Sequence, residues 1–161
     1  MNEIETQRLR LILESLEETR KRIDAMSDED KVDLPPHWLS LLAAATHPDP
    51  WILGFNMVRR DDDVHIGKIG FKGPPNGEGM VEIAYCVEED QQGNGYATEA
   101  AVAATQEALQ QDDVRFVRAH TLPEPNASTR VLTKAGFRNV GQVVDPEDGP
   151  VWRWERFPDA P

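Results

Sequence analysis

A glycine elbow at Gln92-Gly93-Asn94-Gly95 separates a strand-like segment from an alanine-rich segment near the middle of the chain. Glycine lets a ligand approach the main chain without a Cβ in the way. The segment that follows, Ala97 to Leu109, is rich in helix-forming residues. The first amides of a helix have no internal partners and carry partial positive charge. The elbow therefore predicts a backbone site for a pyrophosphate, unless it is only a turn that leads into the helix.

Two common phosphate-binding motifs do not fit this elbow. The Walker pattern needs a lysine followed by Ser or Thr, and neither follows Gly95. The dinucleotide pattern G-x-G-x-x-G needs a small residue where Thr98 stands, and it belongs near the start of a Rossmann sheet. Here several strand-like segments come before the elbow. A lone Gly-x-Gly is weak by itself, so the surrounding segments must identify the ligand.

The hydrophobic pattern predicts a mixed α/β domain that spans residues 1–161. Alternating or β-branched runs predict seven strands, at 8–13, 51–58, 64–71, 80–87, 114–121, 137–144 and 151–157. Helical spacing predicts four helices, at 15–30, 33–45, 97–109 and 127–135, with Ser15 as the first N-cap. The expected element order is β-α-α-β-β-β-α-β-α-β-β.

Composition and charge exclude several classes of function. No run approaches the roughly 20 apolar residues that a membrane span needs, and the charged opening has no apolar signal core, so we expect a cytoplasmic protein without a membrane partner. The net charge of −12 argues against nucleic acid and suits a cationic partner such as an amine, although acidity also keeps proteins soluble. The four histidines lack ligand spacing, which predicts no metal, and the single cysteine excludes an internal disulfide.

Two segments of the chain resemble one acetyltransferase superfamily. Gln92 to Ala97 matches Q/R-x-x-G-x-G/A, a signature of the acetyl-CoA-dependent GNAT N-acetyltransferases. The longer run GNGYATEAA resembles their Rim-type subgroup, which acetylates ribosomal proteins, and NASTRVLTKAGF (Asn126 to Phe137) resembles that subgroup's second segment. The opening ETQRLRL is similar too. The resemblance covers nearly the whole chain and implies the GNAT fold, a mixed, mostly antiparallel sheet with helices.

The resemblance also implies a site for acetyl-CoA, as co-substrate, between two strands that splay apart. The backbone near Cys86 and Val87 would hold the pantetheine, and Asn126 and Ser128 would face it from the other side. The pyrophosphate would lie on the elbow and the helix start, at Gln92, Gly93, Asn94, Gly95, Tyr96, Ala97 and Thr98.

This chain departs from the family's pattern at several cofactor positions. Gln92 and Asn94 stand where many relatives carry arginines, so main-chain amides must hold more of the phosphate. The family's usual asparagine falls on Pro125, one residue before Asn126. Either Asn126 replaces it through a shifted loop, or that contact is lost.

Acetyl transfer needs a base, because a protonated amine has no lone pair with which to attack the thioester. The first candidate is His120, at the end of the strand that borders the gap, and the second is Glu82 on the opposite strand. Each has a plainer alternative, a hydrogen bond to the next loop for His120 and an ion pair for Glu82. A backbone N–H within residues 85–87 would meet the oxyanion. Leu132 stands where many relatives have the tyrosine that protonates the thiolate, which leaves Ser128 or water for that step.

Two functions therefore stay open. The first is direct acetyl transfer to an amine, either a protein N-terminus or a small amine. The second is a catalytically weak acyl-CoA-binding sensor, which the absent tyrosine, the shifted asparagine and the missing arginines favour. A thiol enzyme built on Cys86 and His120 is disfavoured, because direct transfer needs no covalent intermediate. A homodimer is possible, since relatives often form dimers.

Overall fold

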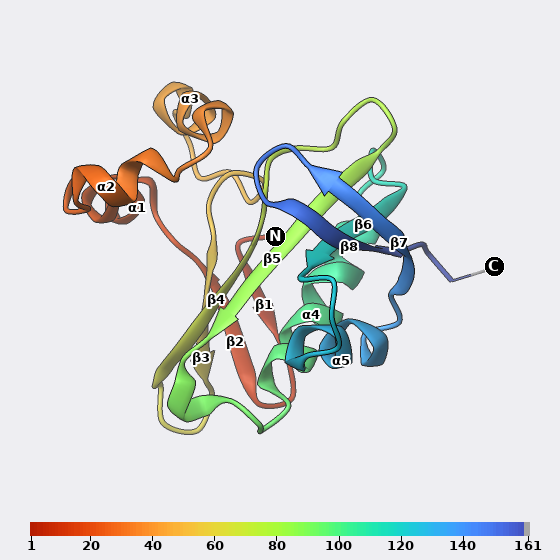
Figure 1. Ribbon diagram of the computed structural model, residues 1–161. Helices are drawn as coiled ribbons and strands as arrows, with labels where there is room; N and C mark the ends of the chain where they lie inside the picture. Colours follow the sequence, from red (N-terminus) through yellow and green to blue (C-terminus); the bar gives the residue numbers. More distant parts are fainter. Residues whose placement is uncertain (160–161) are drawn as a thin grey trace.

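Eight strands form one sheet in the part of the chain that this computed structural model describes, residues 1–159 (Figure 1). The strands are β1 (Glu3–Glu5), β2 (Leu9–Leu13), β3 (Phe55–Arg59), β4 (His65–Phe71), β5 (Met80–Val87), β6 (Phe116–Thr121), β7 (Arg138–Asp145) and β8 (Gly149–Arg156). Their order across the described sheet is β1-β2-β3-β4-β5-β6-β8-β7, and β5 with β6 is the one parallel pair. The expected mixed, mostly antiparallel sheet is confirmed.

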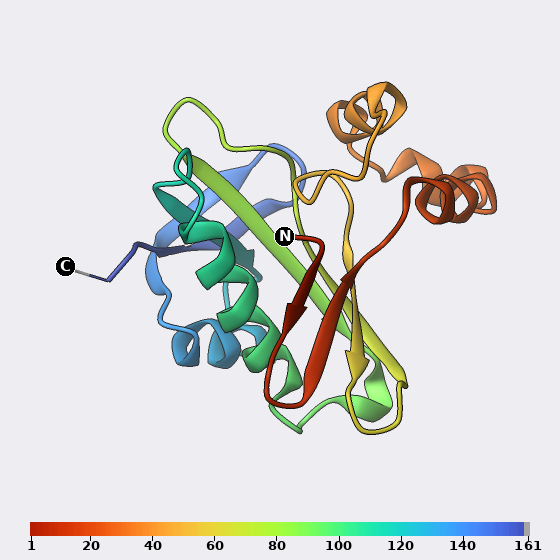
Figure 2. The ribbon, with the colours of Figure 1, turned by 180° about the vertical axis from the view of Figure 1, so that it is seen from behind.

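Helices lie in two separate groups beside this sheet. Within the described residues they are α1 (Leu16–Asp24), α2 (Asp28–Val32), α3 (Pro36–Ala44), α4 (Tyr96–Leu109) and α5 (Ala127–Lys134). Figure 2 shows α4 lying across the sheet, where buried alanines such as Ala101 and Ala104 allow close contact with the strands. The helices α1 to α3 stand apart from α4 and α5, and α1 and α3 share a small core with Ile52 and Leu53 (Figure 1).

The sequence-based element boundaries need three corrections. The helix expected over 15–30 is two helices, because the Ser27 side chain caps a new helix by accepting the N–H of Asp30. The strand expected from residue 51 starts only at Phe55, since residues 50–53 turn around Asp49. The strand β1 was not expected, because its three residues are Glu-Ile-Glu and only pairing with β2 makes them extended.

Glu14 connects the group of α1 to α3 with the sheet. Its carboxylate accepts hydrogen bonds from Arg22 Nε at 3.2 Å and from Lys68 Nζ on β4 at 2.7 Å. The side chain is only 5% exposed. Burial alone would raise the pKa of Glu14, but the hydrogen bonds and charges of Arg22 and Lys68 outweigh it and hold the pKa below its usual value.

Replacing Glu14 by Gln is expected to lower the free energy of unfolding by about 2 kcal/mol at neutral pH, because two cations lose their counter-charge. The folded-state pKa of Glu14 is lowered. Its contribution is therefore complete above the unfolded value of about 4.3 and is lost as the pH falls through the folded value. The difference between wild type and variant should shrink below about pH 4, which urea unfolding at several pH values measures.

In the control, Glu17→Gln on the exposed side of α1, the change should stay below about 0.5 kcal/mol. Equal losses in both variants would contradict the assignment.

Candidate active site

The sheet splits between β5 and β6. The two strands pair only where Met80–Glu82 lies beside Phe116–Arg118. Beyond that point β5 remains paired with β4 as far as Val87, opposite Gly67. Figure 1 shows β5 running on past β6 toward the lower left. A gap therefore opens within the sheet along the second half of β5.

The main chain of β5 presents polar groups to this gap. In an antiparallel pair, alternate residues direct both their N–H and their C=O to the neighbouring strand. The Lys72 N–H donates to the Glu82 carbonyl, and the Glu88 N–H donates to the Ile66 carbonyl, so the even-numbered residues of β5 face β4. The backbone groups of Tyr85 and Val87 consequently face the gap. Cys86 pairs with β4, so its backbone is already in use.

A groove of about 520 Å³ lies along the gap, between β5, the glycine elbow, the start of α4 and one face of α5. The glycine elbow and the segment from Asn126 to Phe137, which the sequence analysis assigned to one cofactor, thus line the same groove. The expected residues that line it are Cys86, Val87, Gln92, Gly93, Gly95, Tyr96, Ala97, Thr98 and Ser128. The lining residues that sequence reasoning did not assign to the cofactor are Tyr85, Gln91, Ala127, Arg130, Val131 and Lys134.

The glycine elbow leaves the first amides of α4 free for a ligand. Gly93 and Gly95 have φ angles of +81° and +82°, which favour glycine. Gly95 is the N-cap and brings no side-chain cap. The first bond of the helix runs from the Glu99 N–H to the Gly95 carbonyl at 3.1 Å. The amides of residues 96–98 precede that bond, so they have no partner inside the helix. The groove therefore contains a helix N-terminus suited to an anion.

Arg8 braces the elbow from the start of the chain. Its Nη1 donates to the Asn94 carbonyl at 2.9 Å, and its Nε donates to Glu99 Oε1 at 2.8 Å. Its guanidinium lies 4.5 Å from the centre of the Tyr96 ring. Glu99 also accepts hydrogen bonds from the Arg8 N–H and the Thr6 hydroxyl. Although burial raises the pKa of Glu99, these bonds outweigh it and lower that pKa. The opening segment and the elbow, two separate motifs in the sequence, are thus locked together.

Three of the expected cofactor residues use their side chains within the protein. The Asn94 side chain donates to the Gln91 carbonyl inside the elbow. The Gln92 side chain donates to the Val87 carbonyl at 3.0 Å, so one main-chain group of β5 is already occupied. The Asn126 side chain accepts the N–H of Thr129 at 3.0 Å as the cap of α5. The lining residues of the groove include Gln92 but not Asn94 or Asn126.

A smaller cavity of about 120 Å³ adjoins the gap and contains all three catalytic candidates, Glu82, His120 and Ser128. It is also lined by Lys72, Ile83, Ala84, Tyr85, Ala119, Leu132 and Asp148. Tyr85 and Ser128 are the two residues that line both this cavity and the groove in the described chain. Cys86 lines only the groove and His120 only the cavity. The cavity and the groove therefore adjoin each other at those two shared residues.

His120 is held by Arg153 inside this cavity. The His120 side chain is 5% exposed, and its Nε2 accepts a hydrogen bond from Arg153 Nε at 3.1 Å. A neutral imidazole that accepts at Nε2 carries its proton on Nδ1. That Nδ1 lies 3.6 Å from Glu82 Oε2 and 3.8 Å from Asp145 Oδ1, and it has no hydrogen-bond partner among the described residues. In this arrangement His120 is a donor directed toward two carboxylates.

The carboxylates of the cavity are partly balanced by Lys72. Its Nζ lies 2.9 Å from Glu82 Oε2 and 3.8 Å from Asp148 Oδ2. Burial lowers the pKa of Lys72, but the hydrogen bond and charge of Glu82 outweigh it, so the pKa is raised. For Asp145, burial raises the pKa, while the N–H groups of Asp148 and Glu147 outweigh it and lower the pKa. Three carboxyl groups, those of Glu82, Asp145 and Asp148, thus lie near two basic groups, those of Lys72 and Arg153, so acidic groups are in excess.

Within residues 1–159, no three His, Cys, Asp or Glu side chains are grouped so that they could hold a metal ion. In the same residues, no helix has both the length and the apolar surface to cross a membrane.

A split sheet with a glycine elbow and a free helix start beside the gap suits an extended ligand that carries an anionic group. The family comparison specifies the class of protein. A family model described as "Acetyltransferase (GNAT) domain" matches residues 7–138. The chain therefore belongs to the GNAT acetyltransferase family.

Curated relatives match over part of the chain. The uncharacterized N-acetyltransferase YjdG of Bacillus subtilis is 32% identical over 89 residues, which are 55% of this chain and 51% of the relative. A second relative from that organism, YnaD, is 34% identical over 87 residues, or 54% and 51%. The chain thus spans about half the length of the curated relatives that it matches.

Solved structures match over nearly the full length. RimL, a ribosomal alpha-N-protein acetyltransferase in complex with coenzyme A, has a TM-score of 0.68 at 14% identity, with 96% of this chain and 97% of RimL covered. A chimera of the Vibrio cholerae spermidine N-acetyltransferase SpeG also has a TM-score of 0.68, at 15% identity, with 94% and 96% covered. Identities this low support the fold alone. RimL is one neighbour among many, so the Rim-type subgroup has only loose support.

Proposed function

We propose that the protein transfers an acetyl group directly from acetyl-CoA to an acceptor amine. The observation that carries this proposal is that two cavities adjoin at the split in the sheet. A groove with a free helix start and a cavity with Glu82 and His120 share Tyr85 and Ser128 as lining residues. A cofactor in the groove would deliver its reactive end to those ionisable groups. Bound acetyl-CoA supplies the activated acetyl thioester.

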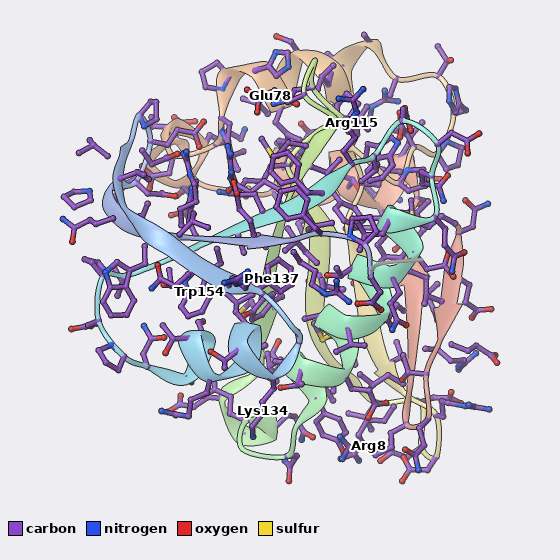
Figure 3. All side chains as sticks on the ribbon, turned by 90° about the vertical axis from the view of Figure 1, so that its right-hand side faces the viewer. Arg8, Glu78, Arg115, Lys134, Phe137 and Trp154 are labelled. Atoms are coloured by element: carbon purple, nitrogen blue, oxygen red, sulfur yellow. The ribbon has the colours of Figure 1, made fainter. Side chains whose placement is uncertain are left out.

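The groove fits the parts of acetyl-CoA in turn. The gap-facing backbone of β5 suits the amides of pantetheine, and the free amides of residues 96–98 suit the pyrophosphate. Arg130 and Lys134, one turn apart on α5, add positive charge to the lining in a chain of net charge −12. Figure 3 shows Lys134 and Arg8 at the same end of the molecule, on either side of the start of α4. These cations suit phosphate groups and offset the arginines that are missing from the elbow.

Glu82 is the group in this cavity best suited to accept the proton of the amine. The basic nitrogen of His120 is engaged by Arg153, and its other nitrogen is directed toward Glu82. For His120 to act as the base, Arg153 would have to release it. We therefore assign the base to Glu82, acting directly or through water, and assign to His120 the positioning of that carboxylate. Ser128 stays a candidate for contact with the departing thiolate.

Two classes of acceptor fit the cavity. The excess of carboxylates favours an amine on a positively charged molecule, because the acceptor arrives protonated and is attracted by negative charge. A polyamine and a protein N-terminus both satisfy this, and the structural neighbours include an enzyme of each kind. A free amino acid is less favoured, since its own carboxylate would face Glu82 and Asp148.

Thiol release from acetyl-CoA tests the proposal. The amines to compare are a polyamine, an aminoglycoside, peptides with free N-termini and free amino acids, with an N-acetylated peptide as the blank. We expect release with the polyamine or with the peptides and little with free amino acids. If acetyl-CoA raises the melting temperature while no amine releases thiol, the sensor alternative is correct. If acetyl-CoA does not bind, both functions are wrong.

A further inference from the structure

We propose that the Tyr85 hydroxyl donates a hydrogen bond to the sulfur of CoA and stabilises the thiolate as it departs. This inference rests on the proposed function. A sulfur that passes from the groove to the cavity must pass the residues that line both, and these are Tyr85 and Ser128. Of the two tyrosines in the chain, Tyr96 lies at the elbow beside Arg8 and lines only the groove.

The Tyr85 side chain reaches across the gap. Tyr85 belongs to β5, where its Cα lies opposite that of Ile69 of β4 while its backbone polar groups face the gap. Its hydroxyl lies 3.5 Å from the carbonyl oxygen of Ser128, in the first turn of α5. That contact is long for an O–H···O hydrogen bond, so the hydroxyl is free to turn to a better acceptor. Leu132 of α5, which lines the same cavity, has no polar atom to offer there and is 1% exposed. Tyr85 thus supplies a phenol hydroxyl between the groove and the cavity, where α5 supplies only the apolar Leu132.

The chemistry requires a group that stabilises negative charge on sulfur. As the new C–N bond forms, the C–S bond breaks and its electron pair moves to sulfur, while Glu82 receives the proton from nitrogen. Counted from the neutral amine, the products are the acetylated amine, CoA thiolate and one proton, which later protonates the sulfur through solvent. An amine that arrives protonated has first lost a further proton to solvent.

Tyr85 keeps its own proton throughout this step. Burial raises the pKa of Tyr85 to about 12. The ordinary thiol pKa of about 8.5 lies well below that value, so the hydroxyl does not transfer its proton to the thiolate. It remains a neutral donor, and hydrogen bonds to a charged partner are stronger than neutral ones.

The ionisation of the bound CoA thiol tests this role without any acceptor. The measurement is the ultraviolet absorbance of the thiolate against pH, with the protein bound to desulfo-CoA as reference to cancel Cys86. In the wild-type protein the bound thiol should have an acid dissociation constant at least roughly tenfold higher than in Tyr85→Phe. The matched control Tyr96→Phe removes the other tyrosine hydroxyl, at the elbow end of the groove. With CoA saturating, it should leave the thiol titration as in wild type, whatever its effect on CoA affinity.

Turnover gives a second readout. Tyr85→Phe keeps the ring and is expected to lower kcat by about 10- to 100-fold, with CoA affinity near that of wild type. Unchanged thiol ionisation in Tyr85→Phe with CoA bound would overturn this inference alone. A shift in Ser128→Ala without one in Tyr85→Phe would also overturn it and give the role to Ser128. Failure of the wild-type protein to bind CoA would overturn the proposed function, and this inference with it.

Discussion

Gly95→Val is expected to weaken CoA binding by at least about 100-fold, because three effects act at one residue. The φ angle of Gly95 is +82°, a region that β-branched residues avoid. A Cβ built there lies 3.3 Å from Arg8 Nη2, the guanidinium that braces the elbow. The valine side chain would also stand over the free amides of α4, where the pyrophosphate is expected. Isothermal titration with CoA measures the loss.

Gly149→Val is the control that distinguishes the effect of backbone strain from the effect of a blocked cofactor site. Gly149 has a φ angle of +74°, close to that of Gly95, and a Cβ there would have no atom within 4 Å. It is the first residue of β8, directly after the turn that follows β7, and it lies outside the groove. Both variants should therefore lose similar stability in thermal unfolding, whereas only Gly95→Val should lose CoA affinity. Normal CoA binding by a folded Gly95→Val variant would remove the elbow from the cofactor site.

Much of this fold could be predicted from local patterns. The elbow and the segment from Asn126 to Phe137 each carry short-range signals, a glycine pair before a helix and a capped amphipathic helix. Their meeting in one groove follows from the element order, which places β5 and β6 side by side. The short strand β1 lacked such a signal, because its extended form depends on pairing with β2. The break at Ser27 was hidden by helix-forming residues on both sides.

The electrostatics of the site could not be predicted in the same way. The environment of His120 is set by Arg153, which is far away in sequence and is brought beside it by the pairing of β6 with β8. The cation that braces the elbow comes from Arg8, at the other end of the sheet order. Arg130 and Lys134 could have been assigned to the groove from the sequence, because they lie four residues apart on the same predicted helix as Ser128. Which residue receives a proton is thus decided by tertiary contacts.

Glu82→Gln is expected to lower kcat by about 100- to 10,000-fold, the range usual for loss of a positioned base. The change removes the carboxylate that faces the cavity but keeps the shape of the side chain. CoA affinity should stay within about threefold of wild type, because Glu82 does not line the groove. Steady-state kinetics, with whichever amine releases thiol in the comparison of acceptors, measures the effect.

The ion pair with Lys72 provides the matched control, since Lys72→Met breaks the same 2.9 Å contact and leaves the carboxylate in place. If Glu82 accepts the proton, Lys72→Met should retain most of the turnover that Glu82→Gln loses, although both lose the pair. If the pair is only structural, the two variants should lose activity and melting temperature together.

A third pattern would reverse the roles within the cavity. Were His120→Ala to lose its turnover while Glu82→Gln kept it, the base would be His120, and Arg153 would have to leave Nε2 during each cycle.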